Sequence, residues 1–532
     1  MDATTTSTAN KKPAPLPPFD ERSDAAWRPL TPVDRWALAG LVVVLVVSAV
    51  PRTPPGVCFE DAGELQVAAS AGGLIHPPGY GGYIAVARPL VLVPLLEPAY
   101  RVTLLAMASA VTALTLLALL LSRLGLSSFI AGIFALVLTW NPGVWLNLVT
   151  PEVYAPSWAL LAAGVYFAAR HARFARRHDL ILSGLAFRLL IANRPPALLY
   201  LPFMMLAWGI AIPRGTFPRR LSVCAIGLLA TLPGIALTLG YVWHADSTQT
   251  AYNYVEHYNA EMRTLPELDD GPAGKWTRMW WLISGQQFSY NLRLDAQTAK
   301  RQARRVSEQF LDARVVIPWP VERVFDARFL VALPVFILML AGSIVLWRDQ
   351  PAVLILGWGI VLGGAAYLLA YEVAGQAADI LPVLLGVSIL VGSALPILAR
   401  RSARARRPWP AVLFGIVGVA SMLNLPPRPD SATRVRADRF LGELDMASLP
   451  PDSVVCTVAL TTGALWYEKV VVTGRNDITI ISGLASSWER LIADQLHRPV
   501  FYAAGGPPPD GWTIEPYRNI GRLVPYVQAA DR

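Results

Sequence analysis

The chain has 532 residues, of which 54% are hydrophobic and 16% are charged, against roughly 25% charged residues in an ordinary soluble protein. This composition excludes a disordered protein and a soluble multidomain enzyme, and it is typical of a multi-span membrane protein. The formal net charge of +9 comes from arginines that stand in short clusters between apolar runs. Such clusters indicate cytoplasmic membrane loops rather than a nucleic-acid-binding surface. The 3 cysteines have neither a disulfide framework nor a metal-binding spacing.

The N-terminal residues 1–33 are rich in Thr, Pro and charged side chains, and we expect a disordered cytoplasmic tail. The first apolar run, Trp36–Val50, lacks a small-residue cleavage site, so it predicts a transmembrane helix rather than a signal peptide. Most of the later runs approach the roughly 20 residues that a spanning helix needs. About eleven spans are therefore expected within residues 34–425. The later runs lie at 101–122, 127–143, 155–169, 179–193, 196–212, 221–243, 329–347, 351–370, 379–398 and 409–425.

One further apolar stretch, 83–97, is placed by the charges around it. It has only 15 residues and contains Arg88. If it were a full span, the arginine cluster at 170–177 would lie outside, whereas leaving it out puts the N-terminus and every arginine cluster in the cytoplasm. We therefore expect a helix that lies on, or dips into, the outer face within the first outer loop, residues 51–100.

Two long polar segments are expected on the outer face. The loop 244–328 carries one helical stretch, 296–313. Residues 426–532 alternate strand-like runs with helix-like runs, which predicts a small α/β domain rather than disorder. The strand-like runs are Val454–Ala459, Ile478–Ser482 and Val500–Ala503, and the helix-like runs are Thr462–Val470 and Ser486–His497.

The first outer loop holds the most unusual residues. Glu60, Asp61 and Glu64 fall within five positions directly after a span, and His76 follows with Pro77–Gly79. A solvated helix start would also explain such acids, since Asp and Glu suit a first turn. The surrounding loop is apolar, however, and an acid at a water–lipid boundary has a perturbed pKa and is a candidate general base. The prolines and the glycine would hold the shape of the loop.

Other polar residues near the outer face are candidates for substrate binding. Glu152 is the only charge in its loop, beside Tyr154, and either begins an interfacial helix or belongs to the site. Arg88, Arg101 and Arg194 could hold a phosphate, although long cationic side chains near a membrane surface also snorkel to water.

At these motifs the chain resembles the membrane proteins grouped as domain of unknown function 2723, the protein O-mannosyltransferase-like family. Ala62 stands where the family has Ser. The resemblance implies a GT-C glycosyltransferase: a multi-span enzyme that uses a polyprenyl-phosphate sugar, with an essential acid in the first outer loop and juxtamembrane helices between the first two spans. The matching segments are Asp61–Glu64, His76–Tyr80, Arg88, Arg101, 151–154, 280–288 and 461–481.

The sequence therefore predicts a mainly α, GT-C-type helix bundle in the cytoplasmic (inner) membrane, with the C-terminal α/β domain in the periplasm. We expect transfer of a sugar from a polyprenyl-phosphate donor to an acceptor hydroxyl on a protein, lipid or glycan. No cofactor is required because the donor is already activated, although the clustered acids could bind a divalent cation. A lipid transporter or flippase and a non-catalytic scaffold are the alternatives. Nucleic acid is not an expected partner.

The expected roles divide the candidate residues into three groups. Asp61 would be the general base. Glu64 and Glu152 would orient the acceptor or the sugar hydroxyls. An arginine would stabilise the leaving phosphate. The expected substrate-binding residues are Glu60, His76, Arg88, Arg101, Glu152, Tyr154 and Arg194.

The arginine clusters generate a test of topology. A membrane-impermeant thiol reagent applied from outside should label a cysteine introduced into 244–328 or 426–532, and it should not label one introduced into 400–407. Labelling of 400–407 from outside would overturn the predicted orientation, and with it the placement of Asp61 on the outer face.

Overall fold

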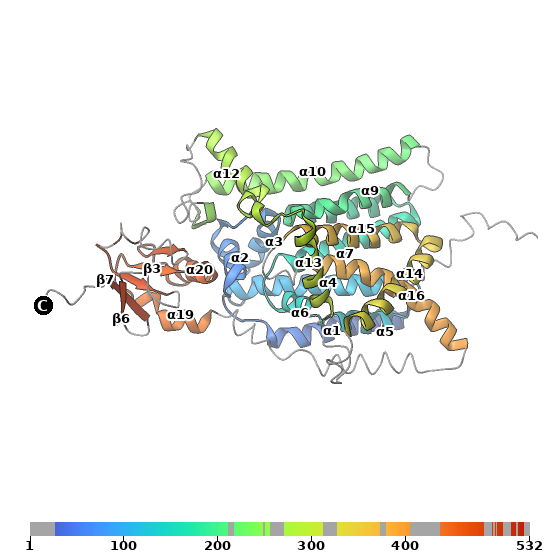
Figure 1. Cartoon of the computed structure of the whole chain (residues 1–532), viewed down its shortest axis with the longest axis horizontal. Coiled ribbons are helices and arrows are strands. Elements are labelled where there is room, and N and C mark those ends of the chain that lie inside the picture. The colour runs from blue at the N-terminus through green and yellow to red at the C-terminus, as the bar shows by residue number, and fades with distance from the viewer. Residues whose placement is uncertain are drawn as a thin grey trace, which may run out of the picture.

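The computed structural model describes residues 27–210, 217–247, 250–255, 271–311, 327–372, 379–404 and 437–483, with short segments between 492 and 525. Long helices lie side by side in a bundle, and a β-sheet lies at one end of it (Figure 1). The long or bundle helices are α1 Pro32–Ala49, α4 Pro98–Arg123, α5 Ser128–Leu138, α6 Pro142–Val149, α7 Tyr154–Phe174, α8 Arg177–Asn193, α9 Leu201–Ile210, α10 Phe217–Ser247, α14 Ala327–Asp349, α15 Pro351–Ala370 and α16 Leu381–Arg404.

Helices occupy ten of the eleven predicted apolar runs, and the eleventh, 409–425, lies outside the described residues. Within the described part of the chain, four helices are long and apolar enough to cross a membrane by themselves. Several others are short or carry charge; α8, for example, has 17 residues and contains Arg188. The protein is therefore a helical membrane protein, and the count of about eleven spans stays a prediction. The four helices are Pro32–Arg52, Pro98–Arg123, Arg220–Asp246 and Pro351–Ala370.

The predicted span at 127–143 is not one continuous helix. It is a pair, α5 and α6, whose axes bend by 91°. The break has a local cause. The Asn141 side chain accepts hydrogen bonds from the backbone N–H groups of Gly143 (2.9 Å) and Val144 (3.3 Å), and Pro142 follows at the first helical position. Asn at the N-cap and Pro at N1 are the usual signals that start a new helix.

The first outer loop contains two short helices, α2 Glu60–Ala71 and α3 Gly81–Val91. The charge pattern predicts only the second and extends it to 97, whereas α3 ends at Val91 with Pro89 in its last turn. The family resemblance implies more than one juxtamembrane helix in this loop. With 11 residues α3 is too short to span a bilayer. Helix α2 was missed because its alanines and glycine give it almost no amphipathic pattern.

The C-terminal strands form a five-stranded sheet of order β4-β3-β5-β7-β6. The first three strands in this order are parallel, and β7 is antiparallel to β5 and β6. Three strands lie where the sequence predicts them; the β6–β7 hairpin was not predicted, and most of the predicted helix 486–497 lies outside the described residues. The strands are β3 Val454–Thr457, β4 Thr479–Ser482, β5 Val500–Tyr502, β6 Trp512–Tyr517 and β7 Ile520–Pro525.

Helices connect this sheet to the bundle. Helix α19 Asp438–Leu444 precedes β3, and α20 Ala459–Tyr467 follows it and continues as a π-helix, Glu468–Thr473. Figure 1 shows α20 between the sheet and α2. Helices α2 and α20 share one apolar core, in which Leu65 and Val67 of α2 pack with buried residues of α20. The C-terminal unit, the described residues from Ala437 onward, therefore packs directly on the first outer loop.

The large loop after α10 contributes two more helices, α12 Pro272–Ser284 and α13 Ala296–Leu311. Helix α13 confirms the predicted helical stretch 296–313. The loop also returns to the first outer loop, where β2 Tyr252–Asn253 pairs in parallel with β1 Gly73–Leu74. This pairing places Tyr252 beside the carboxylates of α2.

Candidate active site

The acidic cluster stands at the start of α2, with Glu60 and Asp61 in its first turn and Glu64 just after it. Asp61 and Glu64 are three residues apart, so they share one helix face, and acids are favourable at this end of a helix. Their environments differ sharply. The Glu64 side chain is 8% exposed, whereas the Asp61 side chain is 60% exposed. The same helix therefore presents one anchored carboxylate and one open carboxylate.

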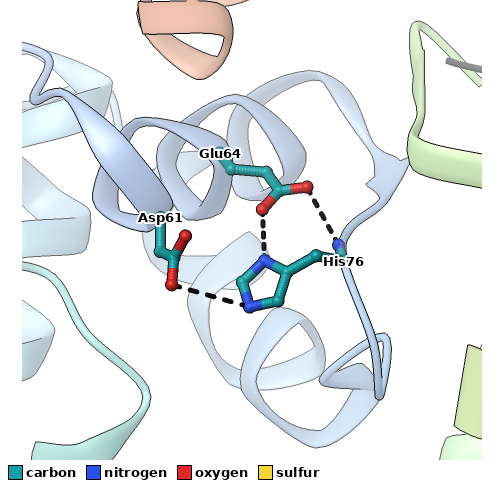
Figure 2. A group of neighbouring side chains, drawn as sticks. All are labelled: Asp61, Glu64 and His76. Atoms are coloured by element: carbon teal, nitrogen blue, oxygen red, sulfur yellow. Dashed lines mark hydrogen bonds and ion pairs between the residues drawn. The ribbon is translucent and has the colours of Figure 1, made fainter. Parts of the chain in front are cut away.

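His76 connects the two carboxylates (Figure 2). Glu64 accepts a hydrogen bond from the backbone N–H of His76 through Oε1 (2.9 Å) and contacts the ring Nδ1 through Oε2. The other ring nitrogen, Nε2, lies 3.7 Å from Asp61 Oδ2. The hydroxyl of Tyr252 also donates to Glu64 Oε1 (3.0 Å). Glu64 therefore ties the loop and β2 to the helix that carries Asp61.

The surroundings of His76 favour its protonated form. Burial by itself lowers the pKa of the imidazole, but the carboxylates of Asp61 and Glu64 outweigh it and raise the pKa to about 10. The geometry agrees, because both ring nitrogens face carboxylate oxygens and only an imidazolium donates from both. This raised pKa favours a protonated His76 between the two carboxyl groups at neutral pH.

Two other acids near the cluster take up protons more readily than usual. Burial, together with the Asp61 carboxylate, raises the pKa of Glu152 to about 8, against an opposing effect of His76. Burial and Asp61 also raise the pKa of Glu60. Asp61 is thus the exposed carboxylate of an acidic group, and its charge raises the pKa of Glu60 and of Glu152.

A cavity of about 880 Å³ opens beside the cluster. Asp61 and Glu64 lie in its wall together with Arg194, whose guanidinium stacks over Tyr154 (4.8 Å to the ring centroid) and Tyr367 (5.3 Å). Asp379 forms a buried ion pair with Arg194. The cavity therefore contains both an open carboxylate and a guanidinium between aromatic rings, which are groups that suit a hydroxyl and a phosphate.

Six of the nine predicted site residues line this cavity, and three are not among its lining residues. The Arg88 guanidinium lies against Gly72 at the end of α2. The Nε and Nη1 atoms of Arg101 are buried without a hydrogen-bond partner in the described structure. Glu152 lies close enough to influence Asp61 and His76 electrostatically. The six lining residues are Glu60, Asp61, Glu64, His76, Tyr154 and Arg194.

Several residues of the site were not predicted from the sequence. Tyr252 is 188 positions from the Glu64 that it contacts, and Asp379 is 185 positions from Arg194. Tyr367, on α15, and Thr462, on α20, also line the cavity. Thr462 stands in the family-like segment 461–481, whereas Tyr252, Asp379 and Tyr367 stand in no local motif, and only the fold brings the four together at the cavity.

The cluster also has the composition of a cation site. Asp61, Glu64 and His76 each offer one ligand atom, and these atoms lie within 4.8 Å of one another. Two carboxylates and an imidazole suit a divalent transition metal. The residues therefore fit such an ion, although His76 would have to lose the proton on the ring nitrogen that binds it.

Comparison with known proteins supports the family. Residues 61–212 match the family model described as "Protein O-mannosyl-transferase TMEM260 N-terminal domain". The match begins at Asp61, includes His76 and Arg194, and confirms the resemblance to the protein O-mannosyltransferase family over these residues. No protein of curated function matches the chain.

A solved structure, ArnT from Cupriavidus metallidurans in the apo state, matches with 12% sequence identity and a TM-score of 0.40. The match covers 93% of this chain and 98% of that chain. At this TM-score the likeness supports no conclusion about shared fold or activity.

The raised pKa of Glu152 predicts a pH-dependent contribution to stability. Its carboxyl binds a proton more tightly in the folded protein (pKa about 8) than at its ordinary value of 4.5. Its contribution is therefore full below about pH 4.5 and is lost as the pH rises through 8. Glu152→Gln, which stays neutral, should gain in melting temperature relative to the wild type between about pH 5 and pH 9.

Differential scanning fluorimetry in detergent measures this difference across pH. The control is Glu443→Gln, which removes an acid whose side chain is 51% exposed on α19, and its difference from wild type should change little with pH. A Glu152→Gln difference that stays flat across the range would contradict the raised pKa.

Proposed function

We propose that the protein is a membrane glycosyltransferase that moves a sugar from a polyprenyl-phosphate donor to an acceptor hydroxyl on the outer face of the cytoplasmic membrane. One observation carries the proposal: the exposed carboxylate of Asp61 and the guanidinium of Arg194 line the same cavity. The helical membrane bundle and the family match over residues 61–212 support it. The name of that family, a protein O-mannosyl-transferase, favours a protein hydroxyl as the acceptor.

Asp61 is the general base of the proposed reaction. As the acceptor oxygen forms its bond to the anomeric carbon, its proton passes to an Asp61 carboxylate oxygen. The bond between the anomeric carbon and the phosphate oxygen breaks, and polyprenyl phosphate leaves with the bonding electron pair. Asp61 suits this role because its side chain is open to the cavity, and a general base must reach the proton that it takes.

Glu64 and His76 position the base. Glu64 is occupied by His76 and Tyr252, so it holds the loop against α2 and is less available to a substrate. The ring Nε2 of His76, 3.7 Å from Asp61 Oδ2, holds the Asp61 carboxylate in position beside the cavity. This assigns Glu64 to positioning rather than to acceptor binding, and Glu60 remains a candidate contact for the sugar.

Arg194 is the proposed phosphate ligand. A guanidinium has five N–H donors, and the pair with Asp379 leaves others for a phosphate oxygen. Stacking between Tyr154 and Tyr367 fixes its plane, and such fixed charge stabilises a leaving phosphate efficiently. Arg88 and Arg101 lie outside the cavity lining, so the phosphate role falls to Arg194 alone.

Substitution of Asp61 tests the proposal. Asp61→Asn keeps the size of the side chain and removes its basicity, so sugar transfer per folded molecule should fall by roughly a hundredfold or more. Thermal stability should change little, because the side chain is 60% exposed. The measurement is single-turnover transfer from a polyprenyl-phosphate sugar, together with release of polyprenyl phosphate.

Two further variants sharpen this test. Glu64→Gln should lower thermal stability, because the buried partner of His76 loses its charge. Asp349→Asn, at an exposed position at the end of α14, should behave like the wild type. Normal transfer by a well-folded Asp61→Asn protein would remove Asp61 as the base. Absence of polyprenyl phosphate release by the wild type would favour a transporter or a scaffold.

We expect this reaction to proceed without an added metal. The imidazolium of His76 already places a positive charge between the two carboxylates, so dialysis against EDTA should leave the transfer rate unchanged. Loss of transfer on chelation, with recovery on addition of Mn²⁺ or Mg²⁺, would instead show that Asp61, Glu64 and His76 hold a divalent cation. A metal-free sample verified by elemental analysis is the required control.

A further inference from the structure

Helix α20 of the C-terminal unit contacts α2, the helix that carries Asp61, through backbone atoms as well as through side chains. A Cβ atom placed on Gly463 would lie 2.4 Å from the backbone N of Glu64 and 2.7 Å from the carbonyl C of Gly63. A Cβ on Gly63 would lie 3.0 Å from the backbone N of Ala464. Only glycine fits so close an approach of two backbones. Helix α20 therefore presses on the peptide bond that immediately precedes Glu64.

Side chains reinforce this contact on both sides. Trp466 packs edge-on against Tyr252, with ring centroids 5.7 Å apart, and Tyr252 donates to Glu64. The hydroxyl of Tyr467 accepts a hydrogen bond from the backbone N–H of Ala99 (3.1 Å), at the start of α4. The position of α2 is thus fixed jointly by the bundle and by α20.

The same helix brings hydroxyl groups to the cavity. Thr462 on α20 and Ser482 at the end of β4 line it, and both are buried. They stand where the chain leaves the carboxyl ends of the parallel strands β3 and β4, which is the edge at which α/β sheets bind ligands. Thr462 donates its hydroxyl hydrogen to the carbonyl of Val458 (3.0 Å), so its oxygen is left as a hydrogen-bond acceptor.

The two contributions to the cavity differ in chemistry. The bundle supplies Arg194 with Tyr154 and Tyr367, a cationic and aromatic surface suited to a sugar phosphate. The C-terminal unit supplies Thr462 and Ser482, which are neutral and suited to an uncharged hydroxyl-bearing group. Figure 1 shows α2, which carries Asp61, between α20 and the helices of the bundle.

We propose that the C-terminal unit forms the acceptor side of the transfer site: Thr462 hydrogen-bonds a Ser- or Thr-bearing acceptor peptide, and Gly463 positions α2 so that Asp61 reaches the acceptor hydroxyl. This inference rests on the proposed glycosyltransferase function. It makes Thr462 a specificity-determining residue and Gly463 a positioning residue, and it requires the C-terminal unit for transfer.

The first experiment tests the backbone contact without reference to any substrate. Gly463→Ala forces α20 and α2 apart, so hydrogen exchange in the amides of α2 should rise, and transfer should fall by roughly a hundredfold, the scale of a small misplacement of reacting groups. The matched control is Gly442→Ala in α19, where a Cβ would meet nothing within 4 Å. Equal exchange in α2 for the two variants would overturn the positioning role.

The second experiment tests acceptor binding by Thr462. With polyprenyl-phosphate mannose as the donor and a Ser/Thr peptide as the acceptor, Thr462→Val should raise the acceptor KM about three- to tenfold, the size of one hydrogen bond, and change kcat and the donor KM less. Thr462→Ser should restore the acceptor KM. The control is Thr473→Val, which removes a hydroxyl bonded within its own helix (2.9 Å to Glu468 O) and outside the cavity.

The outcomes separate this inference from the proposed function. If Thr462→Val and Thr473→Val have the same acceptor KM, the acceptor side lies elsewhere and the inference about Thr462 fails, while Asp61 keeps its role. If the wild type releases no polyprenyl phosphate, the proposed function and the acceptor role of Thr462 fail together. The exchange experiment still decides the contact of Gly463 with α2.

Discussion

The geometry of the candidate site depends on the buried carboxylate of Glu64. A buried charge is costly unless it is paired and hydrogen-bonded, and Glu64 meets this requirement with partners from two other segments. His76 supplies its backbone N–H and its ring, and Tyr252 supplies its hydroxyl. Because the loop after α2 and β2 must both reach Glu64, this single group fixes where the first outer loop and the large loop meet.

A second buried polar side chain on the same helix secures α2 to the bundle. Gln66 is fully buried; its amide donates to the carbonyl of Ala99 (3.0 Å) and to Thr103 (3.2 Å), and its oxygen accepts from the backbone of Cys58 (2.8 Å). A helix with so weak an apolar pattern is thus held by specific hydrogen bonds and by backbone contact. Such attachments fix distances more tightly than apolar packing does, which suits a helix that carries the proposed base.

The cavity draws its chemistry from parts of the chain that are distant in sequence. Asp61 comes from the first outer loop, Arg194 from the end of α8, Tyr367 from α15 and Thr462 from the C-terminal unit. The cavity therefore exists only where the bundle, the first outer loop and the C-terminal unit meet.

The sequence by itself determined the membrane character, the placement of most helices and the residues that make local motifs. Composition and apolar run length fix these, because a bilayer demands long apolar helices. The adjacent acids were likewise visible as a group in the sequence, with His76 following them by twelve to sixteen positions. Tertiary structure alone decided that Glu64 is the buried, hydrogen-bonded acid and that Asp61 is the exposed one. It also excluded Arg88 and Arg101 from the cavity lining and introduced Tyr252, Asp379 and Thr462. Contacts across more than 180 residues, such as Glu64 with Tyr252, leave no periodicity or spacing in the sequence, because they arise from packing between elements rather than from the order of residues within one.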